Sequence, residues 1–217
     1  MNNFIKKEWT FLILLIIPFL IGIYVYPHLP EQVPTHWNVH GEVDGYSSRE
    51  FGAFGLPAIN LGMYILLLVT PYIDPKKKNY EKFSSTYRYL RYLMHIFFGA
   101  LYCLTIMAAL GYQIDVGLWI AAGVAILFIA LGNIMGRIRH NYFVGFRLPW
   151  TLANEDVWRK THLVGSKLMV AGGVVGLIGV LLTESTLRFI ILMLALFLPM
   201  IITGVYSYLY FRKVSEQ

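Results

Sequence analysis

Residues 27–52 form a short segment rich in side chains with metal-binding and acid–base chemistry, above all His36, His40 and Asp44, with His28 and Glu42 nearby. Imidazole nitrogens and carboxylate oxygens are donors that zinc accepts, so this set is a candidate zinc site. Its spacing matches no recognised zinc signature. A polar cap whose histidines form local hydrogen bonds is the first alternative, and contact with a peptide is the second. Apart from zinc, we expect no cofactor.

The backbone of the same segment is expected to be extended. Apolar and polar residues alternate with a period of two from Val33 to His40, which places Trp37 on one face of a strand and both histidines on the other. A turn dipeptide beginning at Asp44 follows. Trp37 would then lie on the membrane surface, and Trp37 and Tyr46 become candidate contacts for a hydrophobic ligand.

A second polar segment, residues 137–167, contains several aromatic and basic side chains. Thr151 is a plausible helix N-cap, so we expect a short amphipathic helix over about 152–163 on the inner leaflet of a membrane. Trp158 and His162 would share one face of it. Such a helix could be a lipid anchor or a docking surface for a cytoplasmic partner. The candidate site residues here are Asn133, Asn141, Arg147, Trp150, Trp158 and His162.

The sequence contains no nucleophile elbow, zinc-protease histidine pair or Walker loop. Catalysis would have to use His36, His40 and Asp44, or else His140 and His162. Neither set has the spacing of a nucleophile and its base. We therefore expect a protein that binds rather than an enzyme, with a metal-dependent hydrolase as the alternative.

Six long stretches without Asp, Glu, Lys or Arg must position these segments. About 20 apolar helical residues cross the hydrocarbon layer of a bilayer, so the fold class is predicted to be all-α, a polytopic membrane bundle of six transmembrane helices. His95 is the one histidine or charged side chain inside the stretches, which argues against a proton pump. The stretches are Trp9–Tyr26, Ala53–Ile73, Tyr92–Ile114, Val116–Gly136, Leu168–Thr183 and Phe189–Phe211.

Basic and non-basic connections alternate between the stretches. Lysine and arginine are concentrated in residues 74–91 and 137–167, whereas residues 27–52 contain Arg49 as their one basic residue. By the positive-inside rule both termini are cytoplasmic and the 27–52 loop is extracellular. We divide the chain into an N-terminal membrane unit, 1–110, and a second membrane unit, 111–217.

Composition agrees with a membrane protein. Hydrophobic residues make up 57% of the 217 residues and charged residues only 14%. The formal net charge of +6 comes from basic residues at the ends of the stretches, as a topology signal requires, so we expect no direct binding of nucleic acid. The single cysteine, Cys103, lies inside the third stretch and is expected to be a small apolar side chain.

The 132–162 region resembles the signature of the SdpI family of bacterial immunity proteins. The outer-loop residues Pro34, His36, Gly41 and Asp44-Gly45 are similar to an uncharacterised membrane domain that often precedes it. Leu148 departs from the pattern, in which a threonine is expected. The residues that carry the main resemblance are Gly132-Asn133, Asn141, Gly145, Arg147, Pro149-Trp150-Thr151-Leu152, Trp158 and Thr161-His162.

This resemblance implies a multi-pass protein of the bacterial cytoplasmic membrane that gives resistance to a secreted, membrane-active peptide toxin. Its partners would be membrane lipid, a hydrophobic peptide toxin and a cytoplasmic transcriptional repressor captured by the 137–167 loop. A pure membrane sensor is a further alternative. Neither the particular toxin nor the oligomeric state follows from the sequence.

Overall fold

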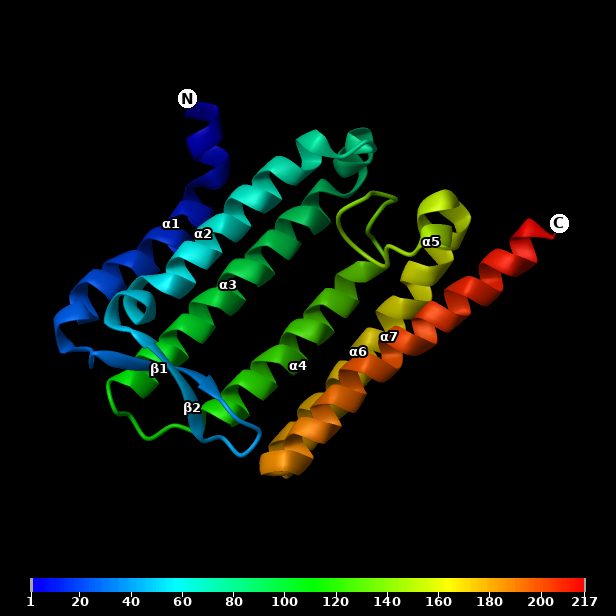
Figure 1. Cartoon of the computed structure of the whole chain (residues 1–217). Helices are drawn as coiled ribbons and strands as arrows, with labels where there is room; N and C mark the ends of the chain where they lie inside the picture. Colours follow the sequence, from blue (N-terminus) through cyan, green and yellow to red (C-terminus); the bar gives the residue numbers. More distant parts are fainter. Residues whose placement is uncertain (1, 217) are drawn as a thin grey trace. The chain divides into compact units, whose positions relative to one another are not determined.

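The computed structural model describes the backbone of residues 2–216 and the side chains of residues 6–216. This part of the chain forms seven α-helices, two short 3-10 helices and one antiparallel two-stranded sheet (Figure 1). Along the chain the elements are α1 (Asn2–Val25), η1 (Tyr26–His28), β1 (Gln32–Trp37), β2 (Val43–Ser48), α2 (Arg49–Ile73), η2 (Lys77–Phe83), α3 (Ser84–Ala109), α4 (Val116–Met135), α5 (Pro149–Ala153), α6 (Glu155–Leu182) and α7 (Ser185–Ser215).

The prediction of an all-α fold with six membrane-spanning helices is confirmed. Six segments of the described chain are helical, long and apolar enough to cross a membrane. The third ends at Ala109, five residues before the predicted end, because the chain turns at Gly111 with a φ of +85°. The six segments are Lys6–His28, Arg49–Ile73, Lys77–Ala109, Val116–Met135, Glu155–Leu182 and Ser185–Ser215.

The prediction of a separate interfacial helix over about 152–163 is wrong. Residues 155–163 are instead the first turns of the 28-residue helix α6, which continues without a break to Leu182. The N-cap is Asn154, whose side chain accepts hydrogen bonds from the backbone N–H groups of Asp156 and Val157. Thr151, the predicted cap, lies inside the short helix α5.

The chain folds into two compact units. The N-terminal unit contains Met1–Leu66 and Arg91–Ile120, and the C-terminal unit contains Leu67–Leu90 and Ala121–Gln217. Helices α2, α3 and α4 each contribute residues to both units. The division of the sequence into membrane units 1–110 and 111–217 stays a prediction.

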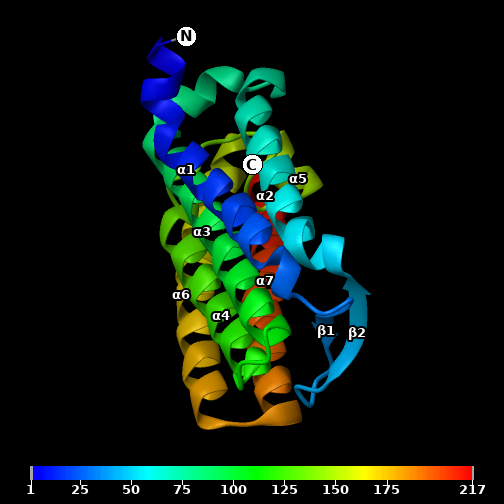
Figure 2. The same cartoon turned by 90° about the vertical axis from the view of Figure 1, so that its left-hand side faces the viewer.

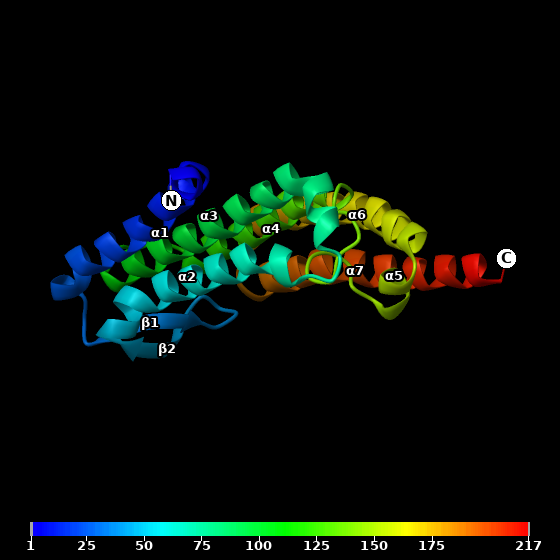
Figure 3. The same ribbon diagram turned by 90° about the horizontal axis from the view of Figure 1, so that it is seen from above.

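In the N-terminal unit, β1 and β2 form a hairpin that follows α1 and leads directly into α2. Figures 1 and 3 show the hairpin beside the first turns of α2. Strand β1 confirms the extended segment predicted from Val33, but it ends at Trp37. The pairing of Val33 with Ser47 and of Trp37 with Val43 brings in β2, a strand that the sequence analysis did not predict.

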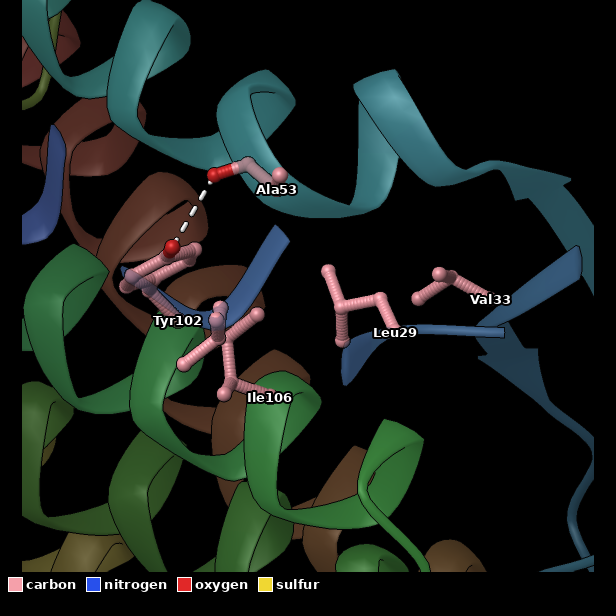
Figure 4. Close-up of a cluster of buried hydrophobic side chains, with 6 residues drawn as sticks. Leu29, Val33, Ala53, Tyr102 and Ile106 are labelled. Carbon is pink, nitrogen blue, oxygen red and sulfur yellow. Dashed lines mark hydrogen bonds between the residues drawn. The ribbon is translucent and has the colours of Figure 1, made fainter. Parts of the chain in front are cut away.

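A buried apolar cluster attaches this hairpin to the helices. It contains Val33 of β1 and Leu29 before it, packed with Ala53 of α2 and with Tyr102 and Ile106 of α3 (Figure 4). The Tyr102 hydroxyl donates a hydrogen bond of 2.9 Å to the carbonyl oxygen of Ala53, so its one polar atom is satisfied. The hairpin is therefore fixed through the inward face of β1.

In the C-terminal unit, α6 and α7 are antiparallel neighbours joined by a very short connection, at the bottom of Figure 2. Their backbones approach closely at glycines. A Cβ on Gly172 would lie 2.4 Å from the carbonyl oxygen of Ala195, and one on Gly176 would lie 2.9 Å from the Ala195 Cβ. The Gly-x-x-x-Gly spacing at 172–176 thus serves packing within the fold.

Gly52 gives a test of the hairpin attachment. A Cβ at this position would lie 2.6 Å from the Val33 side chain, so Gly52→Ala should destabilise the protein by about 1–3 kcal/mol through overpacking. Gly62→Ala, on the same helix, is the matched control because its Cβ meets nothing within 4 Å. It should be neutral or stabilising by up to about 1 kcal/mol. Thermal unfolding in detergent micelles measures both, and equal stability of the two variants would contradict this attachment.

Candidate functional site

The structure brings two of the three predicted metal ligands together on the hairpin. His36 Nδ1 lies 2.5 Å from Asp44 Oδ1, and the two side chains are 71% and 44% exposed. His40 lies in the turn between the strands, where its backbone N–H donates to the Asn38 side chain. Among the described residues, no three His, Cys, Asp or Glu side chains are placed to hold one metal ion together.

The exposed part of the hairpin is built by its turn. The Asn38 side-chain oxygen accepts hydrogen bonds from the N–H groups of His40 and Glu42, at 2.9 and 3.1 Å. Gly41 completes the turn with a φ of +81°. Trp37 is half-buried at the end of β1, and Tyr46 on β2 is 57% exposed. The hairpin therefore presents aromatic surface on a fixed backbone.

In the C-terminal unit the predicted loop residues form a second, buried site, which we call the signature-loop site (Asp74, Lys76, Tyr80, residues 138–151, Trp158 and His162). The fully buried side chain of Asn141 makes several of the hydrogen bonds that hold the loop backbone in this site. The Asn141 oxygen accepts from the N–H groups of Phe143 and Val144, and its nitrogen donates to the carbonyl oxygens of Arg139 and Val144. One side chain thus satisfies a whole turn of irregular backbone.

A buried carboxylate ties this loop to the segment that follows α2. Asp74 Oδ2 accepts a hydrogen bond from the Tyr142 N–H at 2.9 Å and another from the Tyr80 hydroxyl at 3.0 Å. Asp74 Oδ1 accepts from the N–H of Lys76 at 2.6 Å. The Asn79 side chain also donates to the His140 carbonyl at 2.8 Å. The loop is therefore held from two directions by charge-assisted and neutral hydrogen bonds.

Three aromatic rings stack at the centre of the site. The Trp158 ring lies between His140 and His162, at centroid distances of 5.0 and 4.0 Å and interplanar angles of 28° and 21°. The Trp158 indole N–H donates to the Ile138 carbonyl at 3.0 Å. The prediction that Trp158 and His162 share one helix face is thus confirmed. Both side chains are buried in the protein, and neither lies on the surface of a leaflet.

Both nitrogens of His162 are occupied. Nε2 accepts a hydrogen bond of 3.0 Å from the Phe146 N–H, so the ring proton must be on Nδ1. Nδ1 lies 2.7 Å from the Trp158 carbonyl oxygen, to which it donates. A Cβ on Gly145 would lie 2.2 Å from Nε2, so glycine is required at this close approach. His162 is therefore a structural support and has no nitrogen left for a metal or a proton transfer.

His140 is the one histidine of this site that meets a cation. The Lys76 ammonium donates to His140 Nδ1 at 3.0 Å. Burial of the imidazole, and secondly the Lys76 charge, lower the pKa of His140. The ring is therefore neutral when the protein is folded at neutral pH.

The other predicted residues are placed differently. The Trp150 indole donates to the Ser207 hydroxyl of α7 at 2.7 Å. Arg147 is exposed, and its guanidinium donates to the Tyr142 carbonyl at 3.1 Å. Asn133 is exposed on α4. Arg147 thus lies at the surface of the site, whereas the amide of Asn141 and the imidazole of His162 are buried within it.

Sequence reasoning missed Asp74, Lys76 and Tyr80, because nothing in their local spacing connects them with residues 138–162. The acidic residue at the very end of an apolar stretch was the available signal. A carboxylate that directly follows a membrane-spanning stretch and is buried needs hydrogen-bonding partners. Asp74 is such a residue, because it is only 2% exposed.

Gly145→Ala should destabilise this site strongly. The φ of +117° is unfavourable for alanine, and the new methyl group would overlap with His162. Gly111→Ala is the matched control, since Gly111 has a φ of +85° but open space around it. We expect Gly145→Ala to lose about 1–3 kcal/mol more than Gly111→Ala in thermal unfolding. Equal losses would mean that His162 is not in this position.

His140 gives a pH dependence of stability. An unfolded histidine binds a proton below about pH 6.5, whereas the folded ring resists protonation until the pH falls to its lowered pKa. The contribution to stability is therefore complete above about pH 6.5 and is lost as the pH falls through the folded pKa. Melting temperatures from about pH 7.5 to about pH 5 should fall less steeply for His140→Asn than for the wild type.

Lys76→Met is the companion variant for this measurement. It should flatten the pH profile only in part, because burial is the larger cause of the pKa shift and remains. A His140→Asn profile parallel to that of the wild type would contradict the buried, neutral imidazole.

Comparison with known proteins adds the family to this geometry. Residues 13–61 match a domain of unknown function, DUF1648, and residues 137–210 match the SdpI/YfhL protein family. The chain is 30% identical to the Immunity protein SdpI of Bacillus subtilis (strain 168) over 210 residues, 97% of this chain and 98% of that protein. No solved structure matches. The signature-loop site lies within residues 137–210, apart from Asp74, Lys76 and Tyr80. This multi-pass membrane chain belongs to the SdpI/YfhL family.

Proposed function

We propose that this chain is an immunity protein of the bacterial cytoplasmic membrane, which protects the cell from a secreted, membrane-active peptide toxin. The observation that carries the proposal is the similarity to the Bacillus subtilis immunity protein along almost the whole chain. The six apolar helices agree with a role at the bilayer, where such a toxin acts.

Protection by binding is supported by the geometry of both candidate sites. In the signature-loop site the polar atoms of Asn141 and His162 are used in hydrogen bonds within the protein. The His36–Asp44 pair on the hairpin is exposed to solvent and has no third ligand among the described residues. These arrangements suit a scaffold for recognition better than a centre for hydrolysis.

In this proposal the hairpin faces the outside and both termini face the cytoplasm. The half-buried Trp37 and the exposed Tyr46 contact the hydrophobic peptide, as aromatic anchors commonly do in interfaces. The signature-loop site then lies on the cytoplasmic side, with Arg147 exposed. There it is suited to capture a cytoplasmic repressor, provided that the bound toxin favours one of two arrangements of the site.

The first experiment compares the source bacterium with and without this gene after challenge with peptides concentrated from its own culture medium. We expect the strain without the gene to be killed at lower peptide concentrations. In the complemented strain, Trp37→Ala or Tyr46→Ala should weaken peptide binding by roughly tenfold or more, because each removes an aromatic anchor. Equal killing with and without the gene would remove toxin resistance as the function.

The same strains separate binding from the two alternatives. Binding predicts that intact peptide is recovered with the membrane and that His36→Ala still protects. A metal-dependent hydrolase that uses His36, His40 and Asp44 predicts cleaved peptide and loss of protection in His36→Ala. A pure sensor predicts that Arg147→Ala abolishes gene induction while no variant, including deletion, changes survival.

A further inference from the structure

A buried polar cluster in the N-terminal unit takes no part in the proposed function. Glu8 of α1 and Arg91 of α3 are only 8% and 7% exposed. The Arg91 guanidinium donates two hydrogen bonds to the Glu8 carboxylate, Nη1 to Oε1 at 3.1 Å and Nη2 to Oε2 at 2.5 Å. The Tyr64 hydroxyl of α2 donates to Glu8 Oε2 at 3.1 Å. A buried charge pair in a membrane protein needs all of these contacts.

His95 belongs to the same cluster. The Arg91 guanidinium carbon lies 4.1 Å from the Phe11 ring centroid and 5.4 Å from that of Tyr64. The His95 ring lies 5.7 and 5.8 Å from these same two rings. Since Arg91 and His95 are also four residues apart on α3, they lie on one face of the helix, in one aromatic enclosure.

The proton of the His95 ring is fixed by Asn60. Nδ1 lies 2.7 Å from the Asn60 side-chain oxygen, which can only accept, so Nδ1 carries a proton, and in the neutral ring Nε2 is then an acceptor. The His95 side chain is buried, with 1% of its surface exposed. Within the described part of the chain, His95 Nε2 and Arg91 Nε are both buried atoms without a hydrogen-bond partner.

A donor and an acceptor left unpaired in such an enclosure are each unfavourable. Here the Arg91 Nε–H is a donor and His95 Nε2 is an acceptor, and one water molecule can accept from the first and donate to the second. We propose that Arg91 and His95 bind a single buried water molecule between them. The proposal is independent of the immunity function.

The water would close a ring of hydrogen bonds through three helices. The ring runs from Asn60 to His95, through the water to Arg91, and then through Glu8 to Tyr64. Asn60 and Tyr64 are one helical turn apart on α2, so the backbone of α2 completes it. Such a site fixes α1 against α2 and α3 at the level of Glu8.

The test is NMR spectroscopy of the full chain in lipid nanodiscs, with isotopically labelled histidine. The His95 signals are identified by their ring contacts with Phe11 and Tyr64, so the measurement needs the wild type only. We expect a neutral ring protonated on Nδ1 and a direct magnetisation transfer from water to the ring. A ring protonated on Nε2, or a ring without contact with water, would overturn the proposal.

Arg91→Lys is the matched variant, because lysine keeps a positive charge beside Glu8 but has no Nε–H group. We expect it to lose the water contact while the His95–Asn60 hydrogen bond remains, and to lower the ratio of folded to unfolded protein by about tenfold. A water contact that persists unchanged in a folded Arg91→Lys variant would show that Arg91 does not hold the water.

Discussion

A buried N–H, carbonyl or charge that bulk water cannot reach needs a hydrogen-bonding partner, most often within the protein. One group of buried polar residues in each unit shows how the chain meets this constraint. In the C-terminal unit, Asn141 and His162 satisfy the irregular backbone that connects α4 with α5. In the N-terminal unit, Glu8 is neutralised by Arg91 and receives the Tyr64 hydroxyl. These polar contacts act together with close packing between helices, as at Gly172 and Gly176, where the backbones of α6 and α7 approach each other.

The sequence was sufficient to predict the membrane-spanning helices and insufficient to predict the contacts between them. Apolar length predicts a spanning helix directly, and all six were found. Local spacing also predicted the extended segment at Val33 and the shared face of Trp158 and His162. The separate helix at 152–163 was a wrong prediction, because amphipathic residues at the start of a spanning helix have the same pattern as an interfacial helix.

The candidate site was harder to predict than the fold. Asp74 and Asn141 are 67 positions apart in numbering, and Tyr80 contacts both, so no local period could reveal the group. The pairing of Glu8 with Arg91 spans 83 residues. Residue type alone also misleads about role: His162 has the chemistry of a base or ligand, yet both of its nitrogens are used to hold backbone groups.

Helix α6 begins beside the stacked imidazoles and continues unbroken for 28 residues to Leu182. Its contact with α7 through Gly172 leaves no space for side chains to repack between the two backbones. A closely packed helix without a break moves as one rigid body, so a tilt at one end also displaces the other end. A displacement of the start of α6 beside the buried Trp158 would therefore also displace the α6–α7 connection at its other end.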